Sequence, residues 1–288
     1  MKKCYRFLLI LPLLFPAYIF SATVNKTLYL NQGSFMAVDS TTFPAYAFNE
    51  DPVYSPKNAT ITLNAGDRLI VTVINTDSLQ HGFIVKGFPG SSRTLIVMGV
   101  IVDTIDFPNP GVFIFHDNEN YPRFTYLGAA GIISVESSVP DARFFWNLHE
   151  FNRLWNLNPD SAQTMNWLNF NPDYFTVNGA SYPFIDADSS AKIRGAVGDT
   201  IYIYCANTGR SVHSIHFHGY HCRILHSSKN NQQVNWVKDS QAVWPMETVL
   251  FELVPDKPGL FPVHDHNLMA LTANLYYSNG IMIMMHIQ

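Results

Sequence analysis

Apolar and polar residues alternate with a period of two in several short segments of the chain. The clearest are residues 65–75 (AGDRLIVTVIN) and 197–207 (VGDTIYIYCAN), which share a Gly-Asp turn, an alternating run and a closing asparagine. Because successive side chains of a strand point to opposite faces, this pattern predicts strands with one buried face. Long apolar stripes of helical period are absent. We therefore expect an all-β fold of short strands separated by Gly, Pro and Asn turns.

These two segments belong to an internal repeat. Three further pairs of segments match in the same order: 79–82 (LQHG) with 216–219 (HFHG), 110–118 (PGVFIFHDN) with 258–266 (PGLFPVHDH), and 131–135 (GIISV) with 280–284 (GIMIM). Four ordered matches indicate two copies of one unit, and the short turn-separated strands are typical of a β-sandwich. The sequence therefore predicts two tandem β-sandwich domains, over residues 23–138 and 139–288.

Residues 1–22 have the features of a secretory signal. A basic start is followed by an apolar run over residues 7–20 and by the small residues Ser21 and Ala22, which predicts cleavage near Ala22. The alternative is an uncleaved membrane anchor, but the run is short and is interrupted by Pro12 and Pro16. We expect a secreted or periplasmic protein that has no membrane association after cleavage.

The composition supports a large core and excludes one class of partner. Hydrophobic residues make up 47% of the chain and charged residues 14%, which disfavours disorder. Cleavage would remove three of the 18 basic residues, and 15 − 22 gives a net charge of −7. Such an acidic chain does not suit nucleic acid. The remaining cysteines, Cys205 and Cys222, form either a disulfide or two isolated buried thiols.

Most of the histidines lie in the repeated motifs: His81, His116, His213, His216, His218, His264 and His266. In a strand, His264 and His266 project to one face while Asp265 points to the other. Each buried ring nitrogen needs a partner, and a shared metal ion satisfies several imidazoles together. The pattern therefore predicts a copper or zinc site. For the other histidines we expect hydrogen-bonded structural roles: His149, His221, His226 and His286.

The histidine motifs resemble those of the multicopper oxidase family. HSIHFHGY (residues 213–220) resembles the motif His-Pro-x-His-Leu-His-Gly-His, and HDH (264–266) followed by NLMALTANL resembles the closing His-Cys-His motif. LQHG and HDN resemble His-Trp-His-Gly and His-Ser-His. The resemblance implies two cupredoxin-like Greek-key sandwiches. It also implies a homotrimer, with a trinuclear copper cluster between domain 1 of one subunit and domain 2 of the next.

The family pattern is broken at the type 1 copper, which needs a cysteine thiolate, two histidines and usually a weak axial ligand. His213 occupies one histidine position. Asp265, Ala270 and Leu275 occupy the positions of the cysteine, the second histidine and the axial ligand. We therefore expect no blue copper centre. Since a buried carboxylate needs a partner, we expect Asp265 to pair with His213.

The resemblance retains more of the trinuclear cluster. Of eight family histidines, six remain, and Leu79 and Asn118 occupy the other two positions. By family role, one type 3 copper keeps a complete set of ligands: His81, His116 and His266. The other type 3 copper keeps His218 and His264. The type 2 copper keeps only His216.

Three functions follow from these features. The first is a secreted copper-binding relative of the multicopper oxidases with a metal-binding or structural role. The alternative is a copper-dependent oxidoreductase of altered chemistry, laccase-like or nitrite-reductase-like, because a three-histidine ion with an open position can activate small ligands. The third is an interaction module whose histidines bind nothing tightly. Copper is the expected ion because it outcompetes other divalent metals at imidazole sites, and zinc is second.

Overall fold

The computed structural model of the protein describes residues 22–158 and 166–288. The predicted signal segment thus lies outside the described residues except for Ala22. The expected all-β fold is confirmed, since the helices described are short, notably α1 (Arg123–Tyr126) and α2 (Arg153–Leu157). In these ranges no helix has the length and apolar character needed to cross a membrane.

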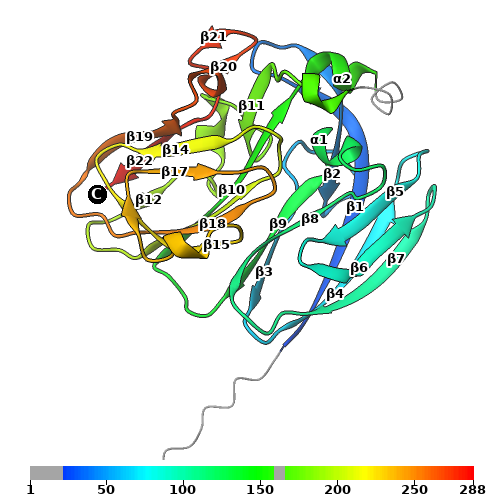
Figure 1. Cartoon of the computed structure of the whole chain (residues 1–288), viewed down its shortest axis with the longest axis horizontal. Helices are drawn as coiled ribbons and strands as arrows, with labels where there is room; N and C mark the ends of the chain where they lie inside the picture. Colours follow the sequence, from blue (N-terminus) through cyan, green and yellow to red (C-terminus); the bar gives the residue numbers. More distant parts are fainter. Residues whose placement is uncertain (1–21, 159–165) are drawn as a thin grey trace, which may run out of the picture.

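The first part of the chain forms two facing sheets (Figure 1). One has the order β2-β1-β4-β7: β1 (Thr23–Met36), β2 (Thr42–Asn49), β4 (Arg68–Asn75) and β7 (Val100–Asp106). The other has the order β3-β9-β8-β5-β6: β3 (Thr60–Asn64), β5 (His81–Val85), β6 (Phe88–Leu95), β8 (Gly111–His116) and β9 (Ala130–Glu136). We call this pair of sheets the first sandwich.

The second sandwich repeats this plan with more strands. Its larger sheet has the order β16-β15-β18-β13-β10-β11-β20-β21: β10 (Ala142–Phe151), β11 (Tyr174–Val177), β13 (Ile201–Asn207), β15 (Cys222–Ser227), β16 (Val237–Lys238), β18 (Thr248–Leu253), β20 (Thr272–Ala273) and β21 (Tyr276–Tyr277). Its smaller sheet has the order β12-β22-β19-β14-β17: β12 (Arg194–Gly195), β14 (His213–Phe217), β17 (Ser240–Val243), β19 (Gly259–Asp265) and β22 (Met282–Ile287). The predicted boundary at residues 138/139 falls between β9 and β10.

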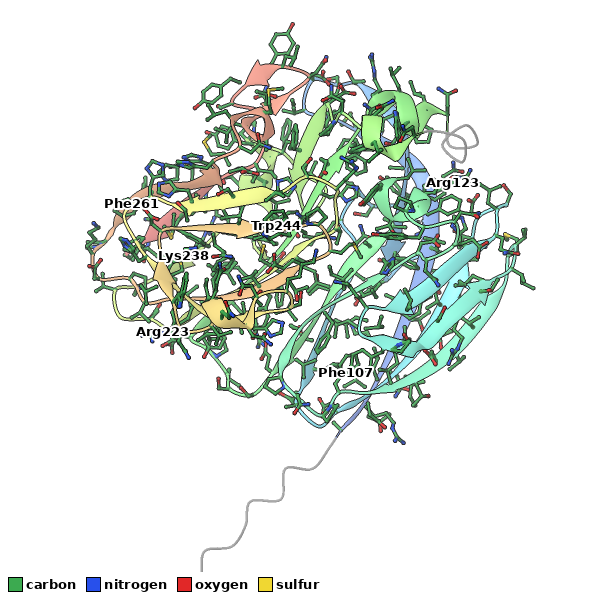
Figure 2. The ribbon with its side chains drawn as sticks, viewed as in Figure 1. Phe107, Arg123, Arg223, Lys238, Trp244 and Phe261 are labelled. Atoms are coloured by element: carbon green, nitrogen blue, oxygen red, sulfur yellow. The ribbon has the colours of Figure 1, made fainter. Side chains whose placement is uncertain are left out.

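The predicted alternation explains why each sandwich has its own core. In β4 every second residue (Leu69, Val71, Val73) is fully buried, while the residues between them are more exposed. Phe107, labelled in Figure 2, follows β7 and is buried in the same cluster. The matching segment β13 buries Ile201 and Ile203 in a separate core. Burial of about 25 cal/mol per Å² of apolar surface makes these cores the main source of stability.

The two sandwiches pack against each other through the outer face of β8 and β9. Val112 and Ile114 of β8 form an apolar cluster with Tyr204 and Met246 of the second sandwich. The Thr248 hydroxyl donates a hydrogen bond of 2.7 Å to the Val112 carbonyl across this contact. The same sheet of the first sandwich therefore has one face in its own core and part of the other against the second sandwich.

Cys205 and Cys222, the two cysteines of the described ranges, are free and buried. This answers the question that the sequence left open, in favour of isolated thiols. Cys205 lies on β13 and Cys222 on β15, and burial raises the pKa of both thiols. Both are therefore protonated and unreactive at neutral pH.

We expect neither the Cys205 thiol nor the Cys222 thiol to react with a thiol reagent in the native protein. Both should react at once in denaturant without any reductant, because no disulfide has to be broken. Counting modified thiols by mass spectrometry before and after denaturation checks this. Unmodified protein in denaturant would mean that the cysteines pair.

Candidate metal centre

The paired strands β14 and β19 place four histidines together on the outer face of the second sandwich. His216 lies directly opposite His264 in the antiparallel register. Ring centroids are 4.7 Å apart for His216 and His218, and 5.0 Å apart for His218 and His264. The rings of His264 and His266 stack at 5.5 Å, so the predicted side-by-side projection of this pair is confirmed. We call these four residues the histidine face.

Hydrogen bonds fix the ring orientation of two of these histidines. His264 Nδ1 lies 3.0 Å from the Asp265 carbonyl, which can only accept, so Nδ1 carries the hydrogen and Nε2 carries a lone pair. His216 Nδ1 lies 2.8 Å from Ser240 Oγ. Contacts of this kind on one ring nitrogen orient metal-ligating histidines in proteins and leave the other nitrogen for the metal.

The spacing of His218 and His264 suits a shared ion. Their Nε2 atoms are 2.9 Å apart and share a hydrogen bond, in which His218 donates because His264 Nε2 carries the lone pair. Two imidazole nitrogens bound at about 2.0–2.1 Å and at right angles, as in a square-planar copper site, stand about 2.9 Å apart, whereas the tetrahedral angle of a zinc site places them about 3.3 Å apart. In the described ranges, however, no group of three or more His, Cys, Asp or Glu side chains is arranged to hold a metal ion. The histidine face of one chain thus offers a two-nitrogen pair with further imidazoles beside it.

His116 of the first sandwich has a similar orientation. It ends β8, and its Nδ1 lies 3.0 Å from Thr125 Oγ1. The Thr125 hydroxyl donates to the Asp117 carbonyl, so its oxygen accepts from His116, and His116 Nε2 keeps a lone pair. Burial lowers the pKa of His116 to about 4, and the nearby charge of Lys86 adds to this effect. The ring is therefore neutral at pH 7, as a metal ligand must be.

His81 has different surroundings from the other predicted ligands. It is fully buried, with Nδ1 2.6 Å from Asp117 Oδ2 and Nε2 2.9 Å from Asp77 Oδ2. Its ring packs against Tyr46 and Phe124. With both nitrogens engaged by carboxylates, His81 offers no lone pair to a metal in this arrangement.

The strand register shows that the repeat alignment around His81 was wrong. Ile84 pairs with His116 as His216 pairs with His264, so His81 corresponds to His213 and not to His218. The turn glycines agree, since Gly87 and Gly219 have φ values of +93° and +79°. The His-Gly of LQHG matched His218-Gly219 only locally, and two residues are too few to fix a register.

By this register, Ile84 and Lys86 of the first sandwich occupy the positions of His216 and His218 in the second. The first sandwich therefore contributes one ligand-like histidine, His116. The face of the second sandwich contributes four. The predicted ligand set is thus concentrated in the second sandwich.

The expected pair of His213 and Asp265 is confirmed, and it has a third member. His213 Nδ1 lies 2.7 Å from Asp265 Oδ2, and Nε2 lies 3.1 Å from Glu150 Oε2. All three side chains are fully buried. Glu150 was missed by the sequence analysis, although a single acid in the apolar strand β10 (ARFFWNLHEF) is a signal that could have found it.

Electrostatic attraction stabilises the cluster of Glu150, His213 and Asp265. Burial by itself lowers the pKa of His213, but the hydrogen bonds to Asp265 and Glu150 raise it to about 9. Burial by itself raises the pKa of Glu150, because it disfavours the charged carboxylate. The contact with His213 outweighs this effect and lowers the pKa of Glu150 to about 2. At neutral pH an imidazolium therefore donates to two carboxylates. The Asp77–His81–Asp117 cluster of the first sandwich has the same geometry, and its two acids raise the pKa of His81 against the effect of burial. It differs in that burial raises the pKa of Asp117 despite the contact with His81.

Comparison with known proteins agrees with this architecture. A family model described as "Multicopper oxidase" matches residues 156–285, somewhat less than half of the chain. The blue copper oxidase of Nitrosomonas europaea superposes with a TM-score of 0.78 at 22% identity, covering 93% of this chain and 86% of the other. The fold is that of the two-domain multicopper oxidases.

A copper nitrite reductase from Nitrosomonas europaea gives a similar result. It superposes with a TM-score of 0.75 at 18% identity, and the alignment covers 92% of this chain and 94% of that one. No significant match is found among curated proteins. At these identities the structural likeness establishes the fold, and the metal sites have to be argued from the residues of this chain.

We expect Asp265→Ala to destabilise the fold by about 3–5 kcal/mol, because it leaves the His213 imidazolium beside one carboxylate in a dry core. Asp117→Ala should have a comparable effect through His81. Urea unfolding of each variant checks this, with Asp256→Ala as control because Asp256 is exposed. Equal stability of Asp265→Ala and Asp256→Ala would contradict a buried ionic cluster.

We also expect the His213 ring to stay doubly protonated at pH 7.5. Its pKa rises from 6.5 to about 9 on folding, so its contribution to stability is fully present below pH 6.5 and is lost as the pH rises through about 9. Ring ¹⁵N chemical shifts measured by NMR report this state directly. A neutral His213 at pH 7.5 would mean that a carboxylate in the cluster carries the proton.

Proposed function

We propose that this protein is a secreted copper-binding member of the multicopper oxidase family that lacks a type 1 copper and has a metal-binding or structural role. The observation that supports this most is the Nε2–Nε2 spacing of 2.9 Å between His218 and His264. The histidine face has imidazoles oriented as metal ligands, and copper is the divalent ion that such donors bind most strongly. The apolar segment at residues 7–20 supports secretion.

The residues that would hold copper come from both sandwiches. In the second sandwich they are the histidine face: His216, His218, His264 and His266. From the first sandwich His116 is the candidate, because its neutral ring has a free Nε2. We assign His81 a structural role, since both of its nitrogens contact carboxylates.

The geometry favours a site shared between chains. One chain presents no group of three metal-binding side chains in the ranges described, and a stable copper or zinc site needs three or four ligands. A second copy that brings its His116 to the histidine face would supply the missing donor. This is the basis on which we propose a homotrimer, by analogy with the assembly that the sequence motifs imply.

The buried clusters are the reason for proposing a role without electron transfer. Asp265 stands at the position where the family motif has a cysteine, and its carboxylate is bonded to His213 and to the backbone N–H of Ser214 and Asn267. No thiolate is available there to accept an electron and pass it to the histidine face. Reduction of oxygen by an external donor is therefore not the proposed activity.

A second candidate function is a copper-dependent oxidoreductase of altered chemistry. The spacing of His218 and His264 favours it, because an ion held by few protein ligands keeps open positions for small molecules. Copper in such a position would supply a redox-active Lewis acid. Turnover of nitrite or of a phenol by the copper-loaded protein would favour this function over a structural role.

We expect copper-loaded protein to lack the intense thiolate band at about 600 nm that marks blue copper sites. Cys205 and Cys222 are buried in the core of the second sandwich and protonated, so neither can replace the missing ligand. An absorption spectrum recorded during copper titration checks this. An intense blue colour would contradict the assignment of Asp265 to the cysteine position.

We expect His218→Ala and His264→Ala each to weaken copper binding by about tenfold or more, since each removes one of very few ligands. His81→Ala should instead lower stability and leave copper affinity of the folded protein nearly unchanged. Competition with a chelator of known affinity measures this. His221→Ala is the matched control because His221 is exposed and lies outside the histidine face. Equal losses in His221→Ala and His218→Ala would refute the site.

A further inference from the structure

A second site-like feature lies between the two sandwiches, on a different sheet from the histidine face. It is a cleft of about 310 Å³, which is near the lower limit for small-molecule sites. It is formed by the turn after β5, by β8, and by the ends of β15 and β18. The lining residues include Lys86, Val112, Ile114, His226, Ser228 and Thr248.

Positive charge in this cleft is not neutralised by an ion pair. Lys86 is half-buried, and its ammonium donates to the Met246 carbonyl. The neighbouring Lys229 donates to the Pro245 carbonyl. Within the described ranges, neither ammonium has a carboxylate within 4.0 Å. Burial lowers the pKa of Lys86, and the charge of Lys229 lowers it further, which shows that the two cations act on each other.

The nearest acidic residue, Glu247, affects Lys86 only through long-range electrostatics. Glu247 is buried, and its carboxylate accepts from the Ser227 hydroxyl at 2.6 Å and from the Trp244 N–H at 2.8 Å. It raises the pKa of Lys86 electrostatically but makes no ion pair with it. An ammonium has three protons, so Lys86 keeps two that are not used by Met246.

The hydroxyl of Ser228 also offers a hydrogen to the cleft. Ser228 Oγ accepts from the Thr248 N–H at 2.9 Å, which leaves its hydroxyl hydrogen to donate outward. The His226 ring lines the same cleft and lies 3.5 Å from Thr248 Oγ1. The apolar walls of the cleft are the side chains of Val112 and Ile114. An apolar wall lowers the local dielectric and strengthens attraction to an opposite charge.

The position of Lys86 in the internal repeat also indicates a positively charged site. By strand register it stands where the second sandwich has His218. A lysine there puts a fixed cation where the second sandwich has a candidate metal ligand. The first sandwich is thereby unsuited to bind a metal at this position and suited to bind an anion.

We propose that this cleft binds a small anion with at least two oxygen acceptors, either a carboxylate or an inorganic oxoanion, held by Lys86 and Ser228. The apolar walls and the volume fit an anion of a few heavy atoms. Charge-assisted hydrogen bonds from Lys86 supply most of the affinity. The proposal does not depend on copper binding, because none of these residues belongs to the histidine face.

The test uses the full-length, copper-free protein and calorimetric titration with inorganic phosphate and with acetate at constant ionic strength. Chloride serves as the reference for general charge screening. Lys86→Met should weaken binding about tenfold or more, which is the usual effect of losing a hydrogen bond to a charged group. Lys86→Arg should retain binding. Lys26→Met is the matched control, since Lys26 is on β1 and pairs with Glu50.

The outcomes separate clearly. Saturable binding of phosphate, of acetate or of both, lost in Lys86→Met and kept in Lys26→Met, supports the site and identifies the oxoanion or carboxylate class. Equal affinities in Lys86→Met and the parent overturn it, as does binding no tighter than that of chloride. If Lys86→Met fails to fold, Lys229→Met decides: Lys229 is exposed, and its removal should weaken binding by a smaller factor. No change in that variant would overturn the proposal.

Discussion

An imidazole held between two carboxylates lies in each sandwich, and the surrounding strands are arranged around it. In the second sandwich it joins three strands that are far apart in sequence, since Glu150 comes from β10, His213 from β14 and Asp265 from β19. It connects the larger sheet to the smaller one across the core. Burying an ion costs free energy of folding unless the ion is fully paired. Here the backbone N–H groups of Ser214 and Asn267 donate the remaining hydrogen bonds to Asp265. Small changes of strand position would leave a charge without its partner.

This contact also determines where the other histidines lie. Asp265 points into the core, so its neighbours His264 and His266 point outward. The same alternation directs His216 and His218 outward once His213 is fixed inside. The histidine face is therefore the reverse side of the buried cluster. The first sandwich has the corresponding buried pair, His81 and Asp117. Of its corresponding outward positions, only 116 is a histidine.

Much of this architecture could be predicted from the sequence, because it rests on periodicity. The alternation in residues 65–75 and 197–207 gave β4 and β13, and Asp265 could be assigned to the core from its place between two outward residues. The register around His81 could not be derived in this way. A His-Gly pair occurs at both positions 81 and 218, and they are distinguished by the pairing of Ile84 with His116, which is a feature of the folded sheet. Glu150 could be suspected as the single acid of an apolar strand, but its contact with His213 could not be predicted, because the two residues are 63 positions apart and nothing in the sequence gives their distance in space.

The position of the histidine face on an outer sheet surface has a kinetic consequence. His266 is exposed, and His216, His218 and His264 are only partly covered, so an ion can reach them from solvent without any strand moving. Loading and loss of an ion in the single chain would then be governed by exchange of its bound water and by encounter, on a much faster time scale than opening of the fold. Slow exchange would begin only when another surface covers the face. The lifetime of a bound ion would thus report how long two chains stay together.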